Sequence, residues 1–217
     1  MTENSANIRQ DKTFKEKLIN FYKEKKILIY SIIISIIVII ISFALYFDSK
    51  ERNKLLLSEN YIEAKVLLES GERDRAKIIL EAIVNNNDKT YSTLALFLIL
   101  NENLITDQND LLNLFNHILE NNKFDEETKN LILFKKMLFQ SNFASEVDLI
   151  EASRQLINED SVWKPHALML MGDYFLSKNE NAKARDYYNQ ILELNNLVGT
   201  KEFYDHAKFK LRNIENE

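Results

Sequence analysis

A run of uncharged residues near the N-terminus constrains this chain more than any other feature. Residues 27–47 read ILIYSIIISIIVIIISFALYF, with no charge, no Pro and no Gly. A helix rises about 1.5 Å per residue, so roughly 20 apolar residues cross the hydrocarbon core of a bilayer. The run is too long for an ordinary strand, and it lacks the polar stripe of a soluble helix. The sequence therefore predicts one transmembrane helix over residues 27–47.

A cleaved secretion signal is the main alternative for this run. Such a signal has an apolar region of about 7–15 residues, followed by a cleavage site made of small residues. Here the run is longer and ends at Leu45, Tyr46, Phe47 and Asp48, which form no such site. Tyr30 and Tyr46 also fit aromatic residues placed at the two membrane interfaces. We therefore favour an uncleaved signal anchor.

Basic residues beside the run predict its orientation. Those before it are Arg9, Lys12, Lys15, Lys17, Lys23, Lys25 and Lys26, and those within a similar distance after it are Lys50, Arg52, Lys54 and Lys65. Cytoplasmic flanks carry the excess of Lys and Arg. We expect residues 1–26 to be a basic cytoplasmic tail and residues 48–217 to lie across the membrane. In a bacterium that means an inner-membrane protein with a periplasmic domain.

Three serines share one face of the predicted membrane helix. Ser31, Ser35 and Ser42 fall within about 40° of one another at 100° per residue. Small residues in such a spacing allow a second membrane helix to pack closely. Serine hydroxyls in membrane helices also bond back to their own backbone. We favour the second interpretation.

The composition outside the run favours an all-α fold. The whole chain has 3 Gly, 1 Pro and no Cys, whereas sheets and α/β folds use Gly and Pro at their turns. The lack of Cys excludes disulfides, thiolate nucleophiles and zinc–thiolate sites. With a net charge of −5 for the chain and +3 for residues 1–26, residues 27–217 carry −8. Such an acidic domain is not expected to bind nucleic acid, which requires clustered Lys and Arg.

Two segments show pairs of amphipathic helices joined by short turns. The first is NKLLLSENYIEAKVLLESGERDRAKIILEAIVNNND, in which Gly71 occupies a helix C-cap position. Its predicted apolar faces are Leu56, Tyr61, Ala64, Leu67 and Leu68, followed by Ala76, Ile79, Leu80 and Ile83. The second is PHALMLMGDYFLSKNENAKARDYYNQILELNN, where Gly172 and Ala184 are small at the expected helix contact and Phe175 and Tyr188 are large one turn further on.

These pairs resemble tetratricopeptide repeats, which have small residues at positions 8 and 20 and large ones at 11 and 24 of a 34-residue unit. With Pro165 at position 1, the matching residues are Gly172, Phe175, Ala184 and Tyr188; with Leu57 at position 1 they are Ala64, Leu67, Ala76 and Leu80. Two looser pairs lie at about 90–121 and 126–158. The resemblance implies an α-solenoid of about four hairpins, which the amphipathic segment 199–217 would cap.

The layout as a whole resembles the YfgM-like family, the ancillary subunits of the SecYEG translocon. The similarity lies in the short basic tail, the single membrane helix and the segment SVWKPHALMLMGDYFLSKNENAKARDYYNQIL. It implies an inner-membrane protein whose periplasmic repeats attend exported proteins and contact periplasmic chaperones. The rival interpretation is a repeat scaffold in cell-envelope assembly or cell division.

The sequence contains no recognisable catalytic constellation. His117, His166 and His206 lie in three different predicted helices, without a second ligand at metal-binding spacing. There is no Gly-rich phosphate loop and no nucleophile elbow. We expect no enzymatic activity, no cofactor and no small-molecule substrate.

The repeat register predicts which side chains line a protein-binding groove. The first helices of successive pairs form the concave wall of a solenoid. The candidates are Tyr61 and Lys65 in the first pair and Trp163, His166, Met169 and Asp173 in the last. Trp163 is either an anchor for a bound peptide or a packing element between the third and fourth pairs, and we favour packing.

Overall fold

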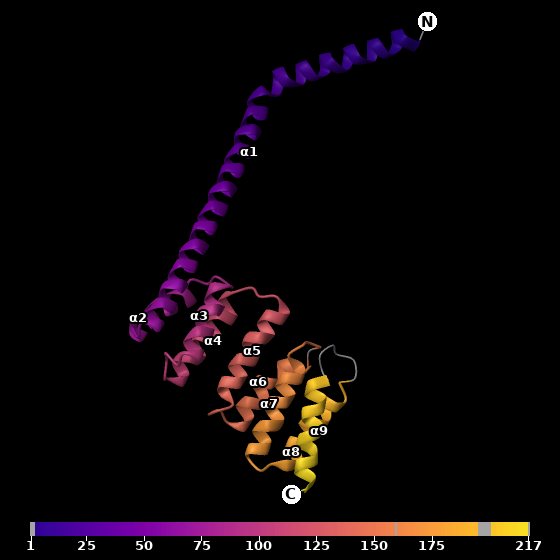
Figure 1. Ribbon diagram of the computed structural model, residues 1–217. Coiled ribbons are helices and arrows are strands. Elements are labelled where there is room, and N and C mark those ends of the chain that lie inside the picture. The colour runs from indigo at the N-terminus through magenta and orange to yellow at the C-terminus, as the bar shows by residue number, and fades with distance from the viewer. Residues whose placement is uncertain (1–2, 159, 195–200, 217) are drawn as a thin grey trace. The chain divides into compact units, whose positions relative to one another are not determined.

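The computed structural model describes residues 3–158, 160–194 and 201–216, which form nine helices and no strand (Figure 1). The prediction of an all-α chain is confirmed for these residues. The helices are α1 Glu3–Glu69, α2 Arg73–Val84, α3 Tyr91–Asn101, α4 Gln108–Asn121, α5 Glu126–Gln140, α6 Glu146–Asn158, α7 Lys164–Ser177, α8 Asn181–Leu192 and α9 Lys201–Asn216. The chain divides into two units, residues 1–56 and residues 57–217.

The first unit contains the apolar segment of α1. All described side chains between Ile27 and Phe47 are exposed, and among the described residues this is the one helix long and apolar enough to cross a membrane. The hydroxyls of Ser31, Ser35 and Ser42 donate to the carbonyls of Leu28, Ser31 and Val38 at 2.9, 2.9 and 2.8 Å. All three hydroxyls are thus bonded to backbone carbonyls of their own helix, which is the interpretation that we favoured over packing against a second membrane helix.

The second unit begins with the last turns of α1, which end in a glycine cap. The Gly71 amide donates to the carbonyl of Leu68 at 3.1 Å and the Glu72 amide to that of Leu67 at 2.8 Å, the two bonds of a Schellman motif. Gly71 has φ +85°, a conformation that a residue without Cβ adopts at little cost. The predicted turn at SGERD is therefore confirmed, together with its cap.

The buried face of α1 differs from the prediction at one end. Leu57 is 2% exposed, whereas Leu56, which was predicted to lie on the apolar face, is 53% exposed. The physical reason is the direction of the side chains: at about 100° per residue Leu57 lies about 20° from the buried Ala64 around the helix, whereas Leu56 lies about 80° from it, at the edge of the buried face. The predicted residues Ala64, Leu67, Ala76, Leu80 and Ile83 are buried.

Two clusters of buried apolar side chains hold α2 to α9 and the end of α1 together. The first runs from Leu57 to Ile132, and the second from Met137 to Ile214. Helices that follow one another in the chain pack side by side, and α9 contacts both α8 and α7 (Figure 1). Helix α5 belongs to both clusters because Ile132 faces the first and Met137 the second.

Asp125 begins α5 as its N-cap. Its carboxylate accepts hydrogen bonds from the Thr128 amide at 3.0 Å and the Thr128 hydroxyl at 2.8 Å. These bonds, the backbone one first, favour the charged form and lower the pKa of Asp125 below its ordinary value.

Because this pKa is lowered on folding, Asp125 stabilises the fold above the ordinary Asp pKa and loses that effect as the pH falls through its folded value. We therefore expect Asp125→Ala to lower the melting temperature at pH 7 and to have a progressively smaller effect from about pH 4 downward. Thermal unfolding followed by circular dichroism at several pH values measures this. Asp205→Ala, at an exposed position in the second turn of α9, is the control. A deficit of equal size at all pH values would contradict the assignment.

Candidate functional site

The groove candidates of the first pair lie on the last turns of α1. Tyr61 is half-buried, and its ring centroid is 6.5 Å from that of Tyr91 on α3. Burial raises the pKa of the Tyr61 phenol. Lys65 is exposed. This part of α1 thus presents an exposed cationic side chain beside a partly buried aromatic pair.

The candidates Trp163 and His166 form part of a row of rings. Trp163 stacks on Phe134 of α5 with centroids 5.5 Å apart and lies 4.9 Å from the His166 ring. The His166 ring in turn lies 4.4 Å from Phe203 of α9. Trp163 therefore packs between the third and fourth helix pairs, and α9 shields His166 on its other side.

The Asp173 carboxylate on α7 is hydrogen-bonded to both α8 and α9. Its Oδ1 accepts hydrogen bonds from the Tyr188 hydroxyl of α8 and the Lys210 ammonium of α9, both at 2.8 Å. Burial, and then the bond to Asp173, raise the pKa of Tyr188. Met169 is partly buried against the second cluster. Binding of a protein by these residues remains a prediction, and in this geometry α9 already contacts His166 and Asp173.

The small residues of the last pair permit its close packing. A Cβ added to Gly172 would lie 2.7 Å from Cδ1 and 2.9 Å from Cζ of Tyr188. Ala64, Ala76 and Ala184 are fully buried, and Phe175 is 1% exposed. A side chain larger than hydrogen at position 172 therefore collides with the buried Tyr188 ring.

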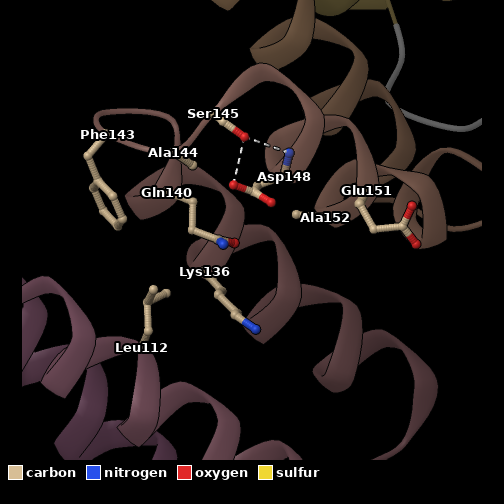
Figure 2. A pocket seen from close by; sticks show the side chains of 9 residues that line it. All are labelled: Leu112, Lys136, Gln140, Phe143, Ala144, Ser145, Asp148, Glu151 and Ala152. Carbon is tan, nitrogen blue, oxygen red and sulfur yellow. Dashed lines mark hydrogen bonds between the residues drawn. The ribbon is translucent and has the colours of Figure 1, made fainter.

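A cleft that the sequence did not suggest lies between α4, α5 and α6 (Figure 2). Its volume is about 560 Å³, within the usual range of ligand sites. The residues that line it are Leu112 of α4, Lys136 and Gln140 of α5, Phe143, Ala144 and Ser145 of the following loop, and Asp148, Glu151 and Ala152 of α6. The apolar residues of the lining thus come from α4, the loop and α6, and the charged ones from α5 and α6.

Two polar groups of α5 inside the cleft are incompletely bonded. The Lys136 ammonium is half-buried, and among the described residues Asn116 of α4 is its one acceptor, at 2.7 Å. Burial lowers the pKa of Lys136, against a smaller opposite effect of Glu120. The Oε1 atom of Gln140 is buried and has no hydrogen-bond partner among the described residues. An ammonium has three donors, so Lys136 has two that Asn116 does not use, whereas Gln140 Oε1 has almost no surface accessible from the cleft.

The carboxylates at the rim, in contrast, have partners. The Ser145 hydroxyl donates to Asp148 at 2.7 Å, while the Asp148 amide donates to the Ser145 hydroxyl at 3.2 Å (Figure 2). This reciprocal pattern caps the start of α6. Glu151 pairs with Arg154 at 3.0 Å, and both side chains are exposed. Each of these two carboxylates thus has a side-chain partner.

Within the described parts of the chain, no group of three or more His, Cys, Asp or Glu side chains is arranged to hold a metal ion. His117 pairs through Nε2 with Asn87 at 2.8 Å, and His166 lies in the ring row on α7. His206 is exposed on α9. The three histidines thus lie on three different helices.

In comparisons with known proteins, no family model, no curated protein and no solved structure matches this chain.

Proposed function

We propose that this chain is a non-enzymatic, single-pass membrane protein of the bacterial inner membrane that displays a protein-binding helical domain in the periplasm. It acts as an ancillary component of the Sec translocon and of periplasmic chaperoning of exported proteins. The observation that carries the proposal is the apolar segment of α1, in which every described side chain between Ile27 and Phe47 is exposed. A segment of this length and composition is stable in a bilayer and not in water.

The packing of α2 to α9 supports a tetratricopeptide-like solenoid as the architecture of the domain. Consecutive helices contact one another in chain order, and α5, α7 and α9 also contact each other in series. Rings of Phe134, Trp163, His166 and Phe203 link this series. A stack of helical hairpins offers an extended surface to other proteins. In this proposal the exposed Lys65 and the Tyr61–Tyr91 pair lie on that surface.

Crosslinking in intact cells tests the partners. A photoreactive amino acid at Lys65, on the proposed binding surface, is compared with one at Lys208, which is exposed on α9. We expect adducts with translocon subunits, periplasmic chaperones and exported proteins from position 65, and fewer from position 208. Adducts with division or outer-membrane assembly factors would instead support a scaffold in envelope assembly. The absence of protein adducts from both positions would overturn the protein-binding function.

A separate experiment tests on which side of the membrane residues 48–217 lie. A reporter fused after Glu217 that is active only in the periplasm is expected to be active, and protease added to intact spheroplasts should digest the domain. Protection of residues 48–217 in spheroplasts, with digestion only in inverted vesicles, would reverse the proposed orientation.

A further inference from the structure

We propose that a patch of apolar side chains on α1 and α3 binds a basic amphipathic helix of a partner protein. The patch consists of Tyr61, Ile62 and Val66 of α1 and Tyr91 and Leu94 of α3, and we call it the α1–α3 patch. The inference rests on the proposed function of the chain as a protein-binding module. It specifies the chemistry of the partner that this part of the surface recognises.

The five side chains of the α1–α3 patch adjoin one another. Ile62 and Val66 are 58% and 57% exposed and lie four residues apart, on one face of α1. Tyr61 precedes Ile62, and its ring centroid is 6.5 Å from that of Tyr91. Leu94 is 41% exposed and lies three residues after Tyr91, on the same face of α3. Exposed apolar side chains grouped in this way are typical of a surface on which another molecule packs.

Unpaired carboxylates border the patch on α1. The acidic residues between positions 55 and 71 are Glu59, Glu63 and Glu69. Each lies three residues from Ile62 or Val66 and is exposed, and none has an ion-pair partner among the described residues. Lys65 is the single basic residue in the same range, and the sequence of α3 contains no charge. The patch is therefore bordered by three negative charges and one positive charge, or −2.

This charge decides which kind of partner fits the patch. A second copy of the chain would place a net charge of −2 against another −2, and like charges brought together at an interface are unfavourable. An acidic helix would meet the same repulsion. A partner with Lys or Arg beside its apolar residues instead meets carboxylates that no other cation occupies. The attraction between the two speeds their association and weakens as salt is added.

The spacing of the apolar residues matches a helical partner. Ile62 and Val66 are separated by one turn of α1, and Tyr91 and Leu94 by one turn of α3. Rows of side chains three or four residues apart pack against rows of the same spacing on another helix. A partner helix with apolar residues at positions i, i+3, i+4 and i+7 presents such a row, and its flanks can carry the basic residues.

The experiment measures peptide binding to the full-length protein in nanodiscs of zwitterionic lipid, by fluorescence anisotropy. Empty nanodiscs give the baseline, because amphipathic helices also bind lipid. The probe is a fluorescein-labelled helical peptide of about 18 residues, with Leu at the i, i+3, i+4 and i+7 positions and Lys on both flanks. A companion peptide has Glu in place of every Lys. We expect the basic peptide to bind about 10-fold or more tightly than the acidic one, and to lose about 3- to 10-fold in affinity when salt is raised from about 0.05 to about 0.3 M.

Variants of the apolar residues locate the site. Ile62→Gln combined with Val66→Gln keeps the helix propensity of α1 and removes two apolar contacts, so the basic peptide should bind about 10-fold more weakly or worse. Ile78→Gln is the matched control, because Ile78 is 66% exposed on α2 and lies outside the patch. Melting curves verify that each variant is folded.

Variants of the carboxylates test the charge preference. Glu59→Gln combined with Glu63→Gln should weaken binding of the basic peptide about 3- to 10-fold and reduce its salt dependence. Glu126→Gln combined with Glu127→Gln changes the net charge by the same amount at two exposed positions on α5, so it is the matched control. Equal losses in the two double variants would mean that the peptide responds only to the overall charge of the protein, and would overturn the proposal.

Equal binding of the basic and acidic peptides would also overturn the proposal, and so would unchanged binding by a folded Ile62→Gln, Val66→Gln variant. Crosslinking from position 65 in cells is read separately. If either of these results is found while adducts with translocon subunits or exported proteins still form, the preference for a basic helix is refuted and the proposed function stands. If positions 65 and 208 give no adducts while the peptides behave as expected, the proposed function is refuted and the preference of the patch stands.

Discussion

Replacement of Gly172 by alanine is expected to lower the free energy of unfolding by about 3 kcal/mol, the upper part of the range for overpacked cores. The added Cβ would lie less than 3.0 Å from three atoms of the Tyr188 ring. That ring is fully buried, and its hydroxyl is bonded to Asp173, so it cannot move aside without losing a hydrogen bond between α7 and α8. Urea unfolding of the full-length protein in detergent, followed by circular dichroism, measures the change.

Two further variants identify the cause. Gly71→Ala places its Cβ where no atom lies within 4 Å, so its cost of about 1–2 kcal/mol comes from the positive φ alone. Tyr188→Leu costs stability through the lost ring and hydroxyl, but it also removes the atoms that a methyl group at position 172 would strike. We therefore expect the double variant Gly172→Ala, Tyr188→Leu to be more stable than the sum of its single effects predicts. Strict additivity would show that the collision is not the cause.

The second large effect concerns the membrane segment. Ile36→Arg combined with Ile39→Arg places two charges near the middle of the apolar run, each costing about 2.5–3.5 kcal/mol on insertion. The total of about 6 kcal/mol should prevent stable anchoring. We expect the wild-type protein to stay in the membrane pellet after alkaline extraction and the double variant to appear in the supernatant.

The matched control lies on the same helix outside the run. Ile62 and Val66 are 58% and 57% exposed, close to the 50% and 54% of Ile36 and Ile39. Arginine at positions 62 and 66 should leave the protein in the pellet, since these residues lie beyond the predicted membrane segment. The intact mass of the wild-type protein separates an anchor from a cleaved signal, because only an anchor retains residues 27–47. Release of the wild type, or a mass that lacks these residues, would contradict anchoring.

The local features of the fold followed well from the sequence. Gly71 ends α1 and Pro165 lies in the first turn of α7, as predicted, because both residues restrict the backbone directly. The buried positions Ala64, Ala76 and Leu80 followed from helical periodicity, which depends only on neighbouring turns. Leu56 was misplaced because it lies at the edge of the buried face, about 80° from Ala64, and periodicity does not say how wide the buried face is.

The candidate site was harder to predict from the sequence, because contacts between residues far apart in the chain form it. The bonds of Asp173 to Tyr188 and Lys210 join residues 15 and 37 positions apart. In the sequence Asp173 is indistinguishable from a solvated groove residue. Lys136 and Gln140 form an ordinary polar i, i+4 pair until Asn116, 20 residues before Lys136, comes within bonding distance and α6 closes the cleft. Periodicity carries no information about such approaches.

The division of the apolar interior into two clusters has a consequence for cooperativity. Among the described residues the buried members of the two clusters meet on α5, with Ile132 in one and Met137 in the other, so each half of residues 57–217 has its own source of stability. Opening of one half then leaves the other protected, and native-state hydrogen exchange should sort the amides into two groups with different opening free energies. Helix α5 presents one face to each cluster, since Phe139 packs against the first and Phe134 against the second, so its amides should exchange with those of the more stable half.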